Sequence, residues 1–419
     1  RTVRKWTEKL GLTKPSETVS PQYEKAKKKK LNNEKKVLLI GWAQNDTPTL
    51  DNLVNNMEAY ANERDGDIHI IAGRYRNPTS LWTMNNQAAE TWSSRIMDYL
   101  DAARHDVHRY MSIMSDVKIQ PTAVNPLSGL QGMSRENSCI FGHPKVHMEM
   151  IATLDTDKPK MMLTTGAVTK PNYTDSKSGK KGEFHHMYGF VIVEIENDDI
   201  FYVRQVTADD KGNFNDLYYN VKDGKVTKND SIDSLVMGDL HYANHDKDVL
   251  ALTVNKLMKN LKPKNLILHD VFDGFSINHH EIKNPFAQFK KEIDGTNSLK
   301  QEVDDLMVFL KGLKEYKIPN IVVVRSNHDD FIDRWLINTD WRKTVTPKNS
   351  LEYMEYSTAI LKNEAPKGII PWIINREVPE VQALGITDGY KSKGWELGQH
   401  GDSGSNGSRG SLEQFRKLN

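Results

Sequence analysis

The chain has 419 residues, of which 37% are hydrophobic, and a formal net charge of +1. This length allows two or three ordinary globular domains, no stretch is apolar and long enough to span a bilayer, and the single cysteine, Cys139, excludes an internal disulfide. Because the first residues are charged and polar, we expect no signal peptide and a cytoplasmic location. The near-neutral charge means that any DNA binding depends on local basic patches.

Residues 1–14 resemble the end of a helix-turn-helix unit. Thr2-Val3-Arg4 and Trp6 precede the exit Leu10-Gly11-Leu12, which is typical of a recognition helix. We expect the rest of that unit to lie upstream. Residues 15–35 follow with a run of lysines and are predicted to be a basic linker. A solvated basic helix and linker without DNA-binding function explain the same residues equally well.

Residues 36–229 are predicted to form a separate α/β accessory domain. Apolar runs favour strands at Val37–Gly41, Ile68–Gly73 and Phe190–Ile195, and residues 49–63 favour a helix. The sequence does not indicate a function for this domain.

Four histidines of the accessory domain are residues that could bind a metal ion: His143, His147, His185 and His186. Without a helix that sets their spacing, such histidines are more often ordinary surface or core residues. No G-x-x-x-x-G-K-S/T motif occurs in the chain, so we expect no ATP binding.

Residues 230–419 repeat a pattern of strand, polar motif and helix. Short apolar runs predict strands at Ser234–Met237, Asn265–Leu268 and Asn320–Val324, and helical spacing of apolar residues predicts helices over 248–261 and 299–313. Each strand ends at a polar motif. These motifs are Asp239-Leu240-His241, His269-Asp270-Val271-Phe272-Asp273 and Ser326-Asn327-His328-Asp329, and a fourth, Gly398-Gln399-His400-Gly401-Asp402, follows a weaker strand candidate at Gly394–Leu397. Because ligands bind outside the carboxyl ends of parallel strands, we expect these motifs to converge.

The motifs supply the ligand types that a pair of divalent cations requires. A carboxylate can bridge two cations about 3.5–4 Å apart, and such a pair can bind both the attacking and the leaving oxygen of a phosphate. Mixed His, Asp and Asn ligation favours manganese, iron or zinc over calcium. His328 need not be a ligand, because its place beside a candidate ligand suits a general acid that protonates the leaving oxygen. The sequence therefore predicts phosphoester hydrolysis.

In their order and strand context, the motifs resemble the calcineurin-like metallophosphoesterase superfamily, whose signature runs D-x-H, G-D-x-x, G-N-H-D/E, H and G-H-x-H. The resemblance covers about residue 235 to the end of the chain. It implies a layered α/β catalytic domain over residues 230–419. It also implies that Asp239 and His241 bind the first metal ion, that Asp270 bridges, and that Asn327 and His400 bind the second.

The resemblance further assigns His328 as the catalytic histidine, with Asp329 orienting it. The chain departs from the signature where His269 and Ser326 replace glycines, so backbone angles that favour glycine cannot be assumed there. The final G-H-x-H motif does not occur, and we expect it to lie beyond residue 419. Asp273 matches a residue that could orient a ligand through a hydrogen bond.

The fourth motif is similar to the nuclease branch of the superfamily, which includes the repair nuclease SbcD and phage-encoded relatives. There a small-residue loop follows the histidine, and Arg409 in that loop would contact a substrate phosphate. A Gly/Ser-rich linker is the alternative interpretation of the same residues. His279 and His280 are further candidates for substrate contact, and solvent-facing loop histidines are the alternative there.

These features together predict a metal-dependent deoxyribonuclease that hydrolyses DNA with two divalent metal ions, manganese first, with magnesium, iron or zinc as alternatives. The overall resemblance implies a bacteriophage source, action in the host cytoplasm and a homo-oligomer. A phosphatase or cyclic-nucleotide phosphodiesterase of the same superfamily is the first alternative function. A DNA-binding scaffold with a degenerate metal site is the second.

Overall fold

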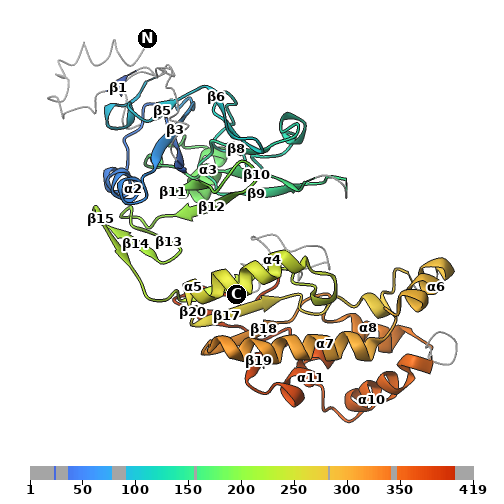
Figure 1. Ribbon diagram of the computed structural model, residues 1–419. Coiled ribbons are helices and arrows are strands. Elements are labelled where there is room, and N and C mark those ends of the chain that lie inside the picture. Colours follow the sequence, from blue (N-terminus) through green and yellow to red (C-terminus); the bar gives the residue numbers. More distant parts are fainter. Residues whose placement is uncertain are drawn as a thin grey trace, which may run out of the picture. The chain divides into compact units, whose positions relative to one another are not determined.

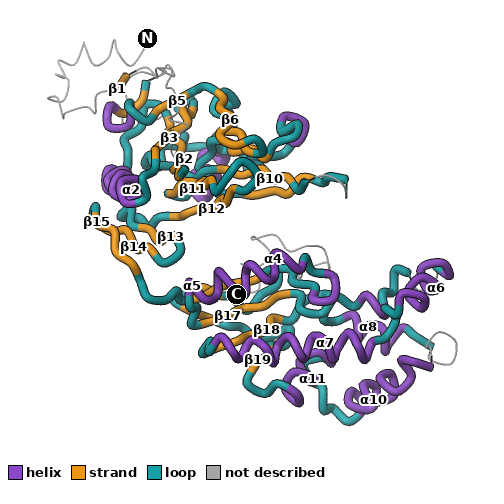
Figure 2. The backbone as a smooth tube through the Cα atoms, viewed as in Figure 1, coloured by secondary structure: helices purple, strands orange, loops and turns teal. Residues whose placement is uncertain are grey.

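The computed structural model describes residues 23–24, 36–77, 91–154, 158–281, 284–340 and 347–401. The chain divides into two compact units, an amino-terminal unit of residues 1–229 and a carboxy-terminal unit of residues 230–419. Both are mixed α/β structures (Figures 1 and 2). The predicted helix-turn-helix end, nearly all of the predicted linker and Arg409 lie outside the described residues. In the part of the chain that is described, none of the helices has the length and apolar character needed to cross a membrane.

Two five-stranded sheets form the body of the amino-terminal unit. The first has the order β12-β11-β2-β3-β5, with strands Phe201–Thr207, Gly189–Ile195, Val37–Gln44, Asp67–Gly73 and Leu100–Asp101. The second has the order β6-β7-β8-β10-β9, with strands Arg104–His108, Met111–Met114, Ser138–Phe141, Lys160–Thr164 and Met148–Ile151. Smaller elements are the pair β1 (Tyr23–Glu24) and β4 (Trp92–Ser93), the meander β13 (Phe214–Asp216), β14 (Tyr219–Lys222) and β15 (Lys225–Lys228), and helices α2 (Asp51–Glu63) and α3 (Lys177–His185).

The three strands and the helix that the sequence predicts in this unit are confirmed as β2, β3, β11 and α2. Successive side chains of a strand point to opposite faces, so β2 contributes to two cores. Ile40 and Trp42 join Ile113 of the second sheet in the core between the sheets. Leu39 faces the other way and packs in the core that includes Met57 of α2.

A four-stranded parallel sheet organises the carboxy-terminal unit. Its order is β16-β17-β18-β19, with strands Ser234–Met237, Asn265–His269, Asn320–Val324 and Val381–Ala383. The helices are α4 (Lys247–Leu252), a π-helical turn (Thr253–Met258), α5 (Lys259–Leu261), α6 (Pro285–Asp294), α7 (Leu299–Gly312), α8 (Phe331–Asn338), α10 (Ser350–Leu361) and α11 (Ile369–Glu377). The weaker strand candidate is confirmed as the short β21 (Trp395–Glu396), which pairs antiparallel with β20 (Lys391–Ser392) outside the parallel sheet.

The apolar stripe of α7 packs against one face of this sheet. Leu299, Val303, Leu306 and Leu310 are buried in one cluster with Leu266 and Leu268 of β17 and Ile321 and Val323 of β18. The alternate residues Ile267 and Val322 lie on the opposite face with Leu384. Since all four strands are parallel, their carboxyl ends lie at one edge.

Two of the histidines considered as metal ligands in the amino-terminal unit are hydrogen-bonded to other groups. The His143 ring is fully buried, with Nε2 3.1 Å from the Gln120 carbonyl oxygen and Nδ1 accepting the Lys145 N–H at 3.0 Å. His186 Nε2 lies 3.0 Å from the Thr169 carbonyl oxygen. Neither ring belongs to a described group of side chains that could hold a metal ion, so both fit the ordinary structural interpretation.

We predict that His143 makes the amino-terminal unit sensitive to acid. Burial lowers the pKa of His143 to about 4, so between that value and its ordinary pKa of about 6.5 the unfolded chain binds a proton that the folded chain excludes. The free energy of unfolding should therefore fall as the pH falls from 7 to 5, by about 2 kcal/mol from this residue. Denaturant unfolding of the wild type and of His143→Gln at both pH values measures this. The variant should be less stable at pH 7 but lose less stability at pH 5, whereas equal losses would contradict the prediction.

Candidate metal centre

The predicted motifs follow β16, β17 and β18 at the carboxyl edge of the parallel sheet. Backbone hydrogen bonds continue past the ends of the first two strands. The N–H of Leu240 donates to the His269 carbonyl at 3.1 Å, and the N–H of His241 donates to the Asp270 carbonyl at 2.7 Å. The first two motifs are therefore held side by side by their backbones.

Three of the candidate ligands have a left-handed backbone conformation. Their φ angles are 46° for Asp239, 43° for His241 and 46° for Asp270. Asp and His tolerate this region better than most residues, and such conformations persist where the surrounding structure enforces them. His269 and Ser326, which replace the signature glycines, are not among the residues with positive φ. Their substitution therefore causes no strain of that kind.

A first group of candidate ligands consists of Asp239, Asp270 and His400, whose ligand atoms lie within 4.8 Å of one another. His400 Nε2 is 3.1 Å from Asp270 Oδ2 and 3.2 Å from Asn327 Oδ1. Four of the five predicted metal ligands thus meet at one place, although their motifs are far apart in the sequence.

The carboxylate of Asp270 fits a cation well. Its side chain is only 4% exposed, and its Oδ1 is buried without a hydrogen-bond partner among the described residues. Burial raises the pKa of Asp270. A buried acceptor without a donor is costly, and a divalent cation is a group that would compensate it.

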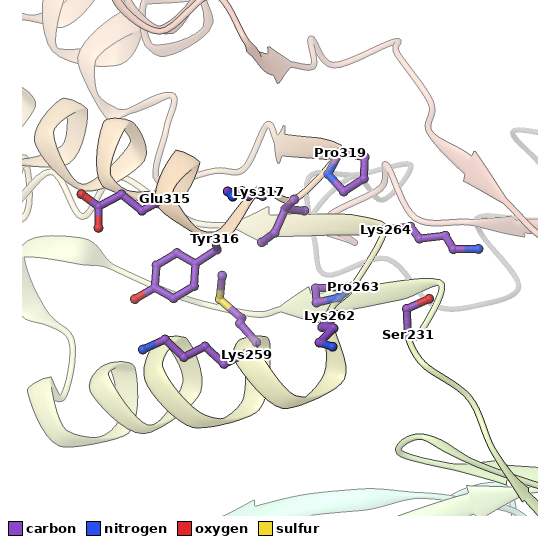
Figure 3. A pocket seen from close by; sticks show the side chains of 11 residues that line it. Ser231, Lys259, Lys262, Pro263, Lys264, Glu315, Tyr316, Lys317 and Pro319 are labelled. Atoms are coloured by element: carbon purple, nitrogen blue, oxygen red, sulfur yellow. The ribbon is translucent and has the colours of Figure 1, made fainter.

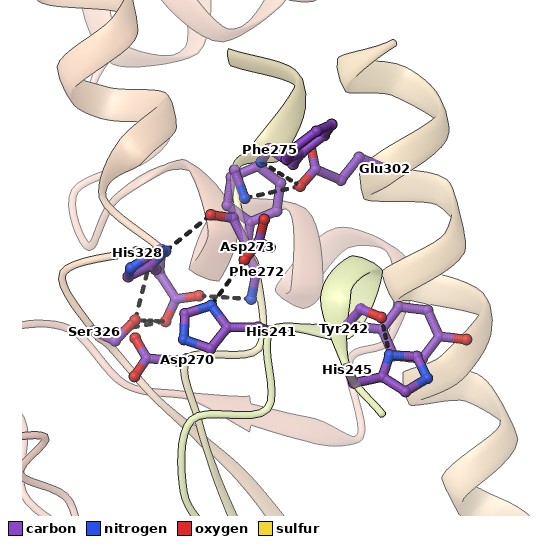
Figure 4. A network of polar contacts seen from close by, with 12 residues as sticks. His241, Tyr242, His245, Asp270, Phe272, Asp273, Phe275, Glu302, Ser326 and His328 are labelled. Atoms are coloured by element: carbon purple, nitrogen blue, oxygen red, sulfur yellow. Dashed lines mark hydrogen bonds and ion pairs between the residues drawn. The ribbon is translucent and has the colours of Figure 1, made fainter. Parts of the chain in front are cut away.

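A second group consists of His241, Asp273 and His328, again with ligand atoms within 4.8 Å of one another. Asp273 contacts both rings (Figure 4), with Oδ1 3.0 Å from His241 Nδ1 and its backbone oxygen 2.9 Å from His328 Nδ1. The hydrogen bond to Asp273 raises the pKa of His241. The two ring centroids are 4.3 Å apart and nearly perpendicular, at 88°. Asp273 therefore orients a candidate ligand and the candidate catalytic histidine together.

Asp329 does not make the hydrogen bond that orients His328, as the resemblance implied, but bonds other groups. Its side chain is 2% exposed and accepts the N–H of Phe272 at 3.2 Å and the N–H and O–H of Ser326, each at 3.0 Å. Burial raises the pKa of Asp329 to about 7. Asp329 thus connects the loop after β18 to the loop after β17, while His328 Nδ1 donates its hydrogen bond to the Asp273 backbone carbonyl.

Sequence reasoning missed Glu302, which holds the loop that follows Asp273. Its buried carboxylate accepts the N–H of Phe275 at 3.0 Å (Figure 4). It also accepts the N–H groups of Gly274 and Ser276 at 2.8 and 3.1 Å and the Ser276 hydroxyl at 2.5 Å. Burial raises the pKa of Glu302, and these hydrogen bonds oppose that shift. The sequence does contain an indication of this role, because Glu302 is an acidic residue next to the apolar stripe of α7, between Leu299 and Leu306.

The two histidines proposed for substrate contact lie beside this centre. The His279 ring is 5.0 Å from that of Phe331, which in turn stacks on His328 at 4.5 Å. His280 contacts the His279 ring at 3.9 Å, and both histidines are exposed. Their contact with a substrate stays a prediction.

The carboxy-terminal unit has one groove at the candidate metal centre and another hollow away from it. A groove of about 620 Å³ is lined by Asp239, His241 and Asp273 together with residues of β16 and α4. Another, of about 590 Å³, lies where β17 and β18 begin and carries Lys259, Lys262, Lys264 and Lys317 (Figure 3). Because it is at the amino ends of the strands, the lysine hollow is not part of the candidate centre.

Comparison with known proteins adds one relative. The chain is 30% identical over 329 residues to Protein A1 of Escherichia phage T5. This similarity supports a bacteriophage origin. The match covers 74% of this chain and 59% of Protein A1, so the chain spans less than two thirds of that relative's length. No family model matches the chain, and no solved structure matches it.

We predict that Glu302→Gln destabilises the carboxy-terminal unit. A glutamine offers one acceptor oxygen where the carboxylate offers two, so at least one backbone N–H of the loop loses its partner, at a cost of about 1–3 kcal/mol. Denaturant unfolding monitored by circular dichroism measures this. The matched control is Asp304→Asn on the same helix, a half-exposed residue paired with Lys300, which should change stability by no more than about 0.5 kcal/mol. Equal stability of the two variants would show that Glu302 does not hold the loop.

Proposed function

We propose that the protein is a metal-dependent deoxyribonuclease that hydrolyses phosphodiester bonds with two divalent ions, most readily manganese. The observation that carries this proposal is the buried Asp270 carboxylate, one oxygen of which has no hydrogen-bond partner among the described residues and the other of which lies 3.1 Å from His400 Nε2. Mixed carboxylate, imidazole and amide donors around one carboxylate are the set that manganese, iron or zinc would take.

The residues divide into ligands and a candidate acid. One cation would be bound by Asp239, Asp270, Asn327 and His400. Further donor atoms next to it would come from His241 and Asp273. When bound, a cation pair supplies activation of a water nucleophile and charge stabilisation at the phosphate. The protein's own part is to fix these side chains before substrate arrives, which the hydrogen bonds of Asp273, Glu302 and Asp329 support.

His328 would act as the general acid for the leaving sugar oxygen. Its Nδ1 is engaged with the Asp273 carbonyl oxygen, so Nε2, on the other side of the ring, is the atom that can deliver a proton. Stacking against Phe331 at 21° between ring planes holds the ring in place. These two contacts support His328 as the general acid and do not require it as a metal ligand.

DNA is the substrate that the remaining observations favour. The fourth motif resembles the nuclease branch of the superfamily, whereas the similarity to a phage protein supports only a bacteriophage origin. The first alternative, a phosphatase or cyclic-nucleotide phosphodiesterase, would use the same centre. A chromogenic phosphomonoester and labelled linear DNA, each with manganese, distinguish these substrates.

We predict that His328→Ala and Asp270→Asn affect the protein differently. Loss of the general acid should lower DNA hydrolysis by about 10²–10⁴-fold and leave bound manganese unchanged, whereas Asp270→Asn should lower both. Rates on labelled DNA and metal content by mass spectrometry measure this. Lys262→Gln, in the lysine hollow at the other ends of the strands, is the control that should keep both manganese binding and hydrolysis of the labelled DNA.

Each alternative has its own outcome. Hydrolysis of the phosphomonoester without hydrolysis of DNA would replace the nuclease by a phosphatase. Binding of DNA without hydrolysis, or hydrolysis unchanged in both variants, would exclude the catalytic assignment and leave a scaffold with a degenerate site.

A further inference from the structure

A second cluster of metal-ligating side chains lies in the amino-terminal unit, outside the proposed centre. It consists of His69, Asp101 and His105, with ligand atoms within 4.8 Å of one another. His69 is on β3, Asp101 ends β5, and His105 is on β6.

Strand register places these three side chains between the two sheets. Asp101 pairs with Ile71, which lies two residues from His69 and so on the same face of β3. His105 pairs with Ile113, and both isoleucines belong to the core between the sheets. Because β5 and β6 are edge strands of their sheets, the cluster lies at the rim where the chain passes from one sheet to the other.

The cluster is buried and its rings are held in place. His69 and Asp101 are fully buried, whereas the His105 side chain is 19% exposed. Asp101 Oδ2 is 2.5 Å from His105 Nε2, and Oδ1 accepts the Ala103 N–H at 2.7 Å. His69 Nε2 is 2.9 Å from the hydroxyl oxygen of the buried Ser115. Such a hydrogen bond from one ring nitrogen orients the other, as partners of metal-bound histidines do.

A His–carboxylate pair alone is ordinary, and this unit contains one for comparison. His147 and Glu149 are 3.2 Å apart and each 30% exposed, and they do not belong to a described group of three candidate ligands. What distinguishes the buried cluster is a second imidazole from another strand beside the carboxylate. Two histidines and one carboxylate form a donor set that suits iron, zinc or manganese.

We propose that His69, Asp101 and His105 bind one divalent transition-metal ion, separately from the centre in the carboxy-terminal unit. Binding replaces the hydrogen bond between Asp101 Oδ2 and His105 Nε2 by bonds from both atoms to the ion, and the neutral His105 ring then carries its proton on Nδ1. The partly exposed His105 provides the side from which the ion enters. The ion joins the edge strands β5 and β6.

The test uses the full chain with the other centre disabled by His241→Gln and Asp270→Asn. Zinc-loaded and desalted protein should retain about one zinc per chain by mass spectrometry, and Co²⁺ loading should give the visible absorption of a protein-bound ion. Adding His105→Gln should remove that zinc and that absorption. Adding His147→Gln instead, the matched control, should retain both. Circular dichroism without metal confirms that each chain is folded.

The outcomes decide the proposal without reference to nuclease activity. Absence of zinc from the background chain, or retention of zinc after His105→Gln, overturns it. If His105→Gln does not fold, Asp101→Asn takes its place, because its retained oxygen can still accept the Ala103 N–H. Since hydrolysis is never measured, failure of this site and failure of the proposed nuclease are separate results.

Discussion

A buried carboxylate at the end of the second parallel strand is the constraint around which the candidate centre is arranged. Asp270 is 3% exposed, and one of its oxygens lacks a donor among the described residues. Leaving such a charge uncompensated in a protein interior is expensive. The neighbouring loops place the side chains of His400, Asn327 and Asp239 close to this carboxylate. A bound cation would compensate the buried carboxylate and would explain why several donor atoms surround it.

The buried acids of the carboxy-terminal unit have two distinct tasks. Asp270 faces other candidate ligands, whereas Glu302 and Asp329 accept backbone N–H groups and hold the loops that follow β17 and β18. Asp273 does both, because its side chain bonds His241 and its backbone bonds His328. Fixing loops with carboxylates limits the movement of the side chains beside them, which is what a preorganised site requires.

The parallel sheet could be predicted because its signals are local. The bounds of β16 and β18 agree with the predicted runs, and α7 begins at the predicted Leu299, since apolar runs and a helical stripe are properties of neighbouring residues. The rule that parallel strands share a carboxyl edge then predicted where the motifs go. By contrast, the partner of His328 is a backbone oxygen 55 residues away, which no side-chain pattern encodes.

The cluster in the amino-terminal unit escaped sequence reasoning for a related reason. His69, Asp101 and His105 come from three strands in two sheets, so their meeting depends on strand register rather than on spacing. His143 and His186, which the sequence offered as possible metal ligands, are hydrogen-bonded to backbone oxygens instead. Histidine density in a sequence is therefore a weaker guide than the topology that brings histidines together.

The most direct measurement of the central claim is a crystal structure of the full chain soaked in manganese, with anomalous scattering recorded. We expect anomalous peaks within bonding distance of Asp270, flanked by Asp239 and His400. Peaks confined to other surfaces, with the Asp270 carboxylate bonded only to protein or water, would contradict it.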